Sequence, residues 1–348
     1  MSTRLKSHTA RPLILLKLNY QTNPLVNKSP VWNNLEHTVN LVRKLLRNFA
    51  PLREPALKMS RHRTVRDFQR LPIIALITLL SGVLLGQRLD PFPNRKKLLA
   101  IGDVRSGFQH DSVSHALATI ERLGYESGAY VTYIRTDSQL LTKNKIERDD
   151  PRTPELGADI NAKNLDYFDA IFFMGTGEGD LTAQQKKDLL AFIHDDGKGF
   201  IGAHTGDDAF FTWPEFGEMI GGYFDNHPWG VFDAPIVVED PSFPAMKGWP
   251  RSFFVRDEIY VHRAPYSAEK IHVLARLDAA KLDMDKGRKN GLHRTDNDFP
   301  VAWTKSYGKG RVFYSTFGHL PESWDNPAIQ TMYFEAIRWA MQSGGVQK

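Results

Sequence analysis

The segment GFIGAHTGDDAF at residues 199–210 constrains the fold more than any other part of the chain. Residues 199–203 are the small and apolar residues typical of a buried strand, and a polar turn with one His and two Asp follows at once. In an open α/β sheet, ligands bind at the carboxyl ends of the strands. The segment therefore predicts a strand that delivers His204, Asp207 and Asp208 to a candidate site.

The basic charge of the chain is confined to its N-terminal part. Residues 1–97 contain 18 Lys and Arg against 4 Asp and Glu, a balance of +14, so that the net charge of +5 leaves −9 for the remaining residues. An acidic domain gives no electrostatic reason to expect nucleic acid as a partner. The chain contains no cysteine, which excludes disulfides, thiolate metal sites and cysteine nucleophiles.

Residues 72–86 form an uncharged, mostly apolar run that four arginines precede. The run is shorter than the roughly 20 residues that a bilayer span needs, but it suits the apolar region of a signal peptide. We interpret residues 59–87 as a signal peptide or uncleaved membrane anchor that begins at Met59. Residues 1–58 are then an over-extended gene model, disordered or forming a short helix. The alternative is a genuine N-terminal extension with a buried helix at 72–86.

This interpretation predicts export to the periplasm or the extracellular space, with membrane contact only through the N-terminal segment. Residues 88–97 read as a polar linker, and residues 98–343 as one α/β domain. The domain is expected to begin with alternating strands and helices. Strands are predicted at 98–103, 130–135, 167–176 and 199–203, and helices at 110–124, 182–196 and around 216–219.

This alternation predicts a mostly parallel sheet with helices on both faces. After Asn226, strands follow one another without long helices, which predicts an antiparallel extension. The later elements are expected as strands at 234–239, 252–262 and 271–278, a hairpin from 300–304 and 311–316, and a closing helix at 326–342.

Four histidines follow predicted strands or turns: His110, His204, His227 and His319. Two chemistries fit them. Neutral imidazoles are ordinary ligands for Zn or another divalent metal, and His110, His204 and His227 are the candidate ligands. The chain has no HExxH spacing, so a metal would depend on convergence in the fold.

Without a metal, the histidines could act as general acids and bases with Asp207, Asp208 or Glu258. Asp207 and Asp208 could instead cap a helix. Glu258 lies beside Asp257 in a predicted strand, so the two carboxyls point to opposite faces, one toward the site and the other toward solvent. The candidate catalytic residues are His204, His319, Asp207, His110 and Glu258, and the candidate substrate-binding residues are Asp103, Asp208, His227, Trp229 and Trp324.

Several separated motifs resemble the ThuA-like family, which is named for trehalose utilisation. They are GFIGAHTGDDAF, GGYFDNHPWG, DEIYVH and the long stretch from PVAWTKSYGKG to the final helix, and they occur in the family's order across residues 97–343. The resemblance implies a flavodoxin-like fold related to class I glutamine amidotransferases, and a role in disaccharide or keto-sugar metabolism.

In those amidotransferases a Cys follows the strand at which His204 stands here. Their His-Pro-Glu element resembles His319, Leu320, Pro321 and Glu322, with one extra residue between His and Glu. Because the chain has no Cys, glutamine hydrolysis by a cysteine triad is excluded, whereas the pocket can serve another ligand.

Three hypotheses follow, and none fixes the oligomeric state. The first is an exported enzyme that acts on a small carbohydrate through His and Asp acid/base chemistry or through a metal. The second is a carbohydrate-binding or partner-docking module without turnover. The third, a surface-anchored structural protein, is favoured only if residues 72–86 remain uncleaved and side chains fill the pocket. Histidines that converge within one ligand's width favour the enzyme, and scattered histidines favour the module.

Overall fold

The computed structural model describes residues 92–104, 108–146 and 163–342. The chain divides into two units, Met1–Gln87 and Arg88–Lys348, and the described residues all belong to the second. The proposed signal segment at 59–87 and the residues before it lie outside the described part, as do residues 147–162. Within the described ranges, none of the helices combines the length and the apolar character that crossing a membrane requires.

The domain is built on a nine-stranded sheet of order β2-β1-β3-β4-β11-β10-β9-β6-β7. The first five strands in this order are parallel to one another. Their order, 2-1-3-4 followed by a fifth strand, is that of flavodoxin-like folds. The parallel strands are β1 (Lys96–Ile101), β2 (Tyr130–Arg135), β3 (Ala170–Phe173), β4 (Gly199–Ala203) and β11 (Gly310–Ser315).

The remaining strands of the sheet pair antiparallel. They are β10 (Pro300–Tyr307), β9 (His272–Leu277), β6 (Val231–Val238) and β7 (Ser252–Glu258). The predicted α/β sheet with an antiparallel extension is therefore confirmed. A separate pair joins β5 (Tyr223–Asn226) to β8 (Val261–Arg263), because the strand predicted at 252–262 is broken after Glu258.

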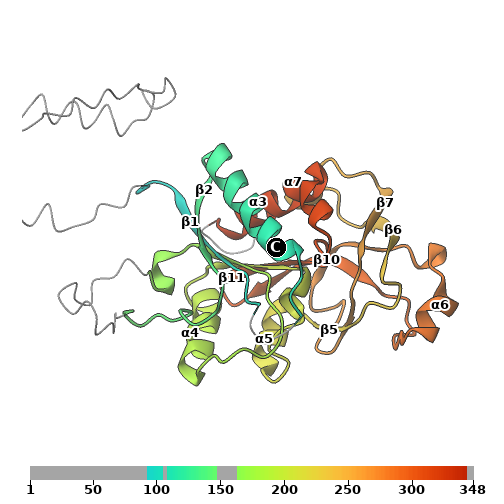
Figure 1. The fold of residues 1–348 in the computed structure, drawn as a ribbon, viewed down its shortest axis with the longest axis horizontal. Coiled ribbons are helices and arrows are strands. Elements are labelled where there is room, and N and C mark those ends of the chain that lie inside the picture. The colour runs from blue at the N-terminus through green and yellow to red at the C-terminus, as the bar shows by residue number, and fades with distance from the viewer. Residues whose placement is uncertain (1–91, 105–107, 147–162, 343–348) are drawn as a thin grey trace, which may run out of the picture. The chain divides into compact units, whose positions relative to one another are not determined.

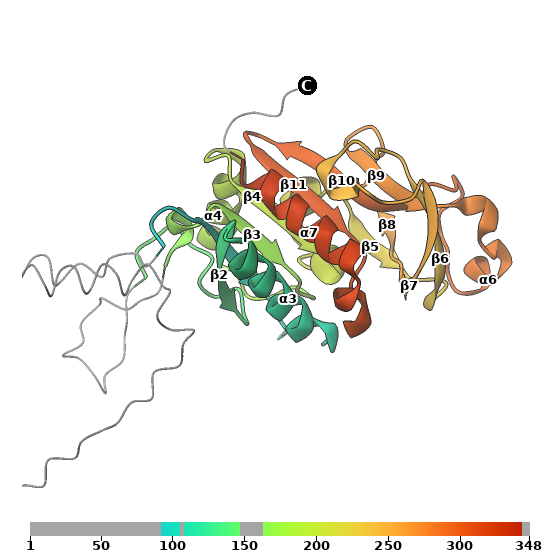
Figure 2. The same cartoon turned by 90° about the horizontal axis from the view of Figure 1, so that it is seen from above.

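Helices cover both faces of the parallel strands (Figure 1). One face carries α3 (Ser112–Ser127) and α7 (Pro327–Ala340), and the other carries α4 (Ala183–His194) and α5 (Pro214–Ile220). Figure 2, seen from the side of α3 and α7, shows β6 and β7 extending beyond these two helices. A short helix that was not predicted, α6 (Met284–Lys289), lies in the extension.

Local sequence explains where two of the helices begin and end. Thr182 and Gln185 form a capping box at the start of α4, each side chain accepting from the other's backbone N–H. The predicted end of α3 at Gly124 is wrong, because the helix continues past this residue. Gly124 lies inside the helix, where the Tyr130 ring packs so closely that a Cβ would clash with it. The helix ends instead at Gly128, whose φ of +71° suits a residue without Cβ.

Candidate metal centre

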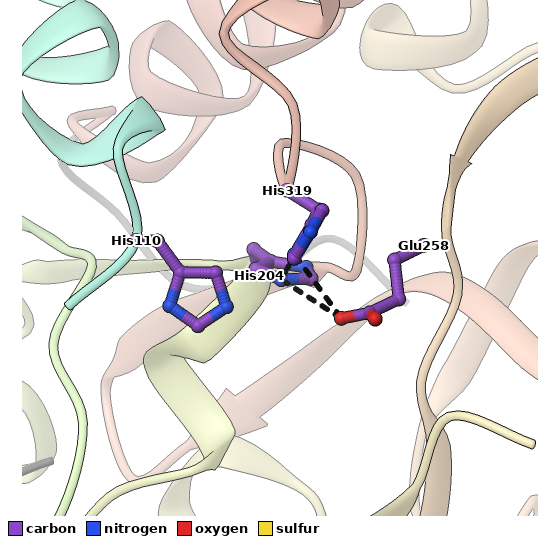
Figure 3. Close-up of side chains that lie close together, drawn as sticks. All are labelled: His110, His204, Glu258 and His319. Carbon is purple, nitrogen blue, oxygen red and sulfur yellow. Dashed lines mark hydrogen bonds and ion pairs between the residues drawn. The ribbon is translucent and has the colours of Figure 1, made fainter. Parts of the chain in front are cut away.

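Four side chains from distant parts of the chain converge at the carboxyl edge of the sheet (Figure 3). His204 directly follows β4, and His319 follows β11, the parallel neighbour of β4. His110 precedes α3, and Glu258 is the last residue of β7. One ligand atom from each of the four lies within 4.8 Å of the others. We call these four residues the His3Glu group.

The shortest distances within the His3Glu group join His319 to two partners. His319 Nδ1 lies 3.1 Å from Glu258 Oε2 and 3.2 Å from His204 Nε2, and His204 Nε2 lies 3.8 Å from the same carboxylate oxygen. The ring of His110 lies 5.0 Å, between centroids, from the rings of both His204 and His319.

Backbone carbonyls accept hydrogen bonds from His204 and His110, in each case from the ring nitrogen that does not face the group. His204 Nδ1 lies 2.7 Å from Thr316 O, and because a carbonyl only accepts, this nitrogen carries the proton. The lone pair of His204 is therefore on Nε2, which faces the group. His110 Nδ1 lies 3.3 Å from Phe108 O, which leaves His110 Nε2 for the group in the same way. Such outer hydrogen bonds are typical of metal-binding histidines.

The charges of the group follow from burial and from one ion pair. Burial lowers the pKa of His204 well below its ordinary value, and burial and the charge of His319 lower the pKa of His110, so both imidazoles are neutral near pH 7. Burial opposes charge on His319 and Glu258 as well. Their mutual hydrogen bond and attraction outweigh it, raising the pKa of His319 and lowering the pKa of Glu258.

The loop that carries His319 is fixed by a buried carboxylate. Asp257 accepts hydrogen bonds from the backbone N–H groups of Gly318, His319 and Leu320 and from Ser323 Oγ, at 2.8 to 3.4 Å. Burial raises the pKa of Asp257 to about 6, although these hydrogen bonds act in the opposite direction by stabilising the ionised carboxylate. The expectation that one of the two neighbouring carboxyls faces solvent is wrong, because Asp257 and Glu258 are both buried, the first under this loop and the second in the group.

A second buried network supports the backbone at His204, which has a φ of +42°. Tyr314 Oη lies 2.7 Å from His204 O and 2.7 Å from Asp207 Oδ1. Asp207 Oδ2 lies 3.1 Å from His262 Nε2, an ion-pair distance whose angles do not make a hydrogen bond. Tyr314, Asp207 and His262 are all fully buried. Asp207 is therefore not a member of the His3Glu group, and its link through Tyr314 allows it to position His204.

The side of the group next to Glu258 carries a further histidine and two aromatic rings. His227 is about half exposed, and its Nδ1 lies 3.5 Å from Glu258 Oε1. The His3Glu group does not include His227, so the structure places it beside Glu258 rather than among the candidate ligands. Tyr260 packs on the ring of His204 at 4.2 Å between centroids, and Phe224 packs on Tyr260 at 4.4 Å.

Four other candidates lie outside the group. Trp229 and Trp324 are buried, and their indole N–H groups donate to the backbone carbonyls of Asp283 and Gly318, so neither can stack on a sugar. Asp103 is buried and accepts from the backbone N–H of Ser138. Asp208 is partly buried, and burial together with the charge of Asp207 raises its pKa to about 7.

Sequence reasoning did not single out Tyr260, His262 or Tyr314 as parts of the site. Tyr260 and His262 lie within the DEIYVH motif, two and four residues after Glu258. Their closeness in sequence to Glu258, a candidate catalytic residue, could have indicated that they also lie near the site. Tyr314 gave no such signal, because a Tyr in a buried strand is most often a core residue.

The His3Glu group has the composition of a divalent-metal site. Three imidazole nitrogens and one carboxylate oxygen suit Zn and similar ions, and ligand atoms in such sites lie about 2.0 to 2.2 Å from the metal. The observed separations of 3.1, 3.2 and 3.8 Å between ligand atoms are compatible with a shared ion of that kind. The imidazoles of His110 and His204, which are neutral near pH 7, also lack the positive charge that would repel a cation.

Comparisons with known proteins bear on the fold and the family. A family model described as ThuA, trehalose utilisation, matches residues 99–340. A crystal structure of a ThuA-like protein from Bacteroides uniformis is 20% identical, with a TM-score of 0.52, over 73% of this chain and 94% of that one. A ThuA-like protein from Parabacteroides merdae is 17% identical, with a TM-score of 0.51, over 73% and 92%. No curated protein matches the chain.

Proposed function

Because this chain belongs to the ThuA family, whose model matches residues 99–340, we propose that it is an enzyme acting on a small carbohydrate at a divalent metal such as Zn. The substrate is a disaccharide or its keto form. The observation that carries the proposal is the convergence of four ligand atoms, from His110, His204, His319 and Glu258, within 4.8 Å. The family's link to trehalose supports the substrate class.

Each residue of the site has a part in this chemistry. A divalent metal, when bound, would polarise a sugar carbonyl or hydroxyl, or activate a water molecule. Glu258 holds the ligand set with one carboxylate oxygen and faces His227 with the other. His227 is the most exposed imidazole at the site, so it is placed to take a proton from a substrate or return one.

The arrangement favours an enzyme over a binding module. Three of the four candidate histidines lie in one group, and the fourth lies 3.5 Å from its carboxylate. A module that only recognises a sugar has no need of the buried, neutral imidazoles of His110 and His204, whose lone pairs face the same group. Perturbed titratable groups that converge in this way are characteristic of catalytic sites.

Turnover by the metal-loaded protein tests the proposal. The full chain is treated with EDTA, reloaded with Zn²⁺, Mn²⁺ or Co²⁺, and incubated with a panel of disaccharides and keto-glycosides. We expect conversion of at least one sugar that EDTA abolishes, that the metal restores, and that the His319→Ala variant lacks. Sugar binding without turnover under every metal condition would instead establish the binding module.

A further inference from the structure

A cavity of about 580 Å³ lies next to the His3Glu group. Residues adjoining the site line it from three directions. Val231 is the cross-strand partner of Glu258, and Leu320 directly follows His319. Arg256 precedes Glu258 by two positions on β7, so both side chains point to the same face of the strand. The cavity therefore lies beside the strand and the loop that carry Glu258 and His319.

The lining of this cavity combines an aromatic surface with polar groups. Phe254 is 64% exposed, which makes it one of the most exposed large apolar side chains among the described residues. Arg256, Glu322 and Asn326 supply charged and amide groups to the same cavity. Among the residues that the structure describes, Arg256 pairs with Asp233 at 3.6 Å, an exposed interaction of small energy that leaves the guanidinium available.

This combination fits a carbohydrate ring. A pyranose presents a C–H face that packs on an aromatic ring, and hydroxyls around its edge that bind planar polar groups. Pockets for small ligands have the same pattern, with apolar and aromatic walls and a few placed polar groups. A lipid or a purely apolar ligand would desolvate Arg256 and Glu322 without offering either side chain a hydrogen-bonding partner.

The distance along β7 indicates the size of the ligand. A strand rises about 3.3 Å per residue, so Phe254 lies about 13 Å from Glu258, four positions away. One sugar ring cannot contact both residues, whereas two linked rings can. Building on the proposed function, we propose that this cavity is a second sugar subsite, which binds the second ring of a disaccharide while the first ring lies at the His3Glu group.

The test compares two-ring and one-ring sugars. Dissociation constants of the full chain for trehalose, maltose, cellobiose and glucose are measured by calorimetry, in EDTA and again with Zn²⁺. For the wild type we expect at least one disaccharide to bind at least tenfold more tightly than glucose. The Phe254→Ala variant should lose this preference, with glucose binding and Zn²⁺ binding unchanged. The matched control is Tyr125→Ala, which removes a similarly exposed aromatic ring from α3.

The outcomes separate this subsite from the proposed function. If Phe254→Ala abolishes the disaccharide preference in EDTA while no metal binds and no sugar is converted, the subsite stands and the metal enzyme is overturned. If the metal binds and a sugar is converted, but Phe254→Ala leaves the preference intact, the subsite alone is overturned. If the wild type binds no disaccharide more tightly than glucose, the subsite is also overturned. This is the result expected if the cavity binds a protein partner instead.

Discussion

His204 Nδ1 lies 2.7 Å from the carbonyl oxygen of Thr316, on the segment that follows the neighbouring parallel strand. This hydrogen bond fixes the tautomer of the imidazole and turns the Nε2 lone pair toward His319, 3.2 Å away. Adjacent parallel strands end at the same edge, so β4 and β11 bring together two histidines that are 115 residues apart in sequence.

Removal of the Tyr314 hydroxyl should weaken metal binding. Tyr314 Oη contacts both His204 O and Asp207, so Tyr314→Phe loosens the backbone that aims His204. Loss of such outer contacts typically costs 10-fold to 100-fold in metal affinity, which we expect here for Zn²⁺. The control is Tyr130→Phe, which removes the hydroxyl of another buried tyrosine, one bound to Ile120 O. Equal Zn²⁺ affinities of the two variants would show that the Tyr314 network is only structural.

Removal of the Asp257 carboxylate should destabilise the domain. Asp257→Ala leaves several backbone N–H groups of the Gly318–Leu320 segment without their acceptor, at a cost of about 3 kcal/mol in the free energy of unfolding. Urea denaturation measures the loss. Asp233→Ala, which removes an exposed carboxylate 3.6 Å from Arg256, should cost under about 1 kcal/mol. A loss for Asp257→Ala no larger than that of this control would refute the role assigned to Asp257.

Sequence reasoning reached the parallel sheet and the positions of His204 and His319 because both depend on local patterns. Runs of small and apolar residues such as 199–203 indicate buried strands. The residues that follow parallel strands lie at one edge of the sheet. Such local patterns do not predict how the strands of the antiparallel extension are arranged in three dimensions. The sequence therefore placed Glu258 on a strand but did not show that Glu258 and His319, rather than His227, complete the His3Glu group.

The substrate-binding roles expected of Trp229 and Trp324 illustrate the same limit. An aromatic residue near a glycine-rich turn can lie at a site or in the core, and the sequence alone does not distinguish the two. Trp324 packs on Tyr333 at 4.8 Å between ring centroids, and Trp229 packs beside Phe299 at 5.5 Å. Tertiary packing decided both cases, and it also left Phe254, which was not singled out, exposed in the neighbouring cavity.

The stability of the domain should depend on pH through Asp208. Its pKa of about 7 in the folded protein exceeds the ordinary value of 3.8, so the folded state binds the proton more tightly. Ionisation of Asp208 therefore makes stability fall as pH rises from about 4 to about 7. Asp208→Asn removes this contribution, so the variant's Tm relative to the wild type should be higher at pH 8 than at pH 4.5. A difference in Tm between variant and wild type that is constant with pH would contradict the assignment.

Export should not require the first 58 residues. The arginines and the apolar run at 72–86 both follow Met59, so a chain that starts there keeps every feature of the proposed signal segment. We expect it to reach the periplasm or medium as efficiently as the full chain, as measured by cell fractionation. Recovery of an exported protein that retains residues 1–58, shown by N-terminal sequencing, would contradict the proposed start.

The central claim, that His110, His204, His319 and Glu258 share one metal ion, is tested most directly by Zn²⁺ titration against a chromophoric chelator. The EDTA-treated full chain is compared with His204→Ala, His319→Ala, the double variant, and a control, His293→Ala, that removes an exposed histidine. The account predicts one tightly bound ion per wild-type chain and per control chain. It also predicts that either single substitution removes most of the affinity, so that the double variant loses little more. Failure of the wild type to bind one ion per chain, or additive losses from the two substitutions, would contradict it.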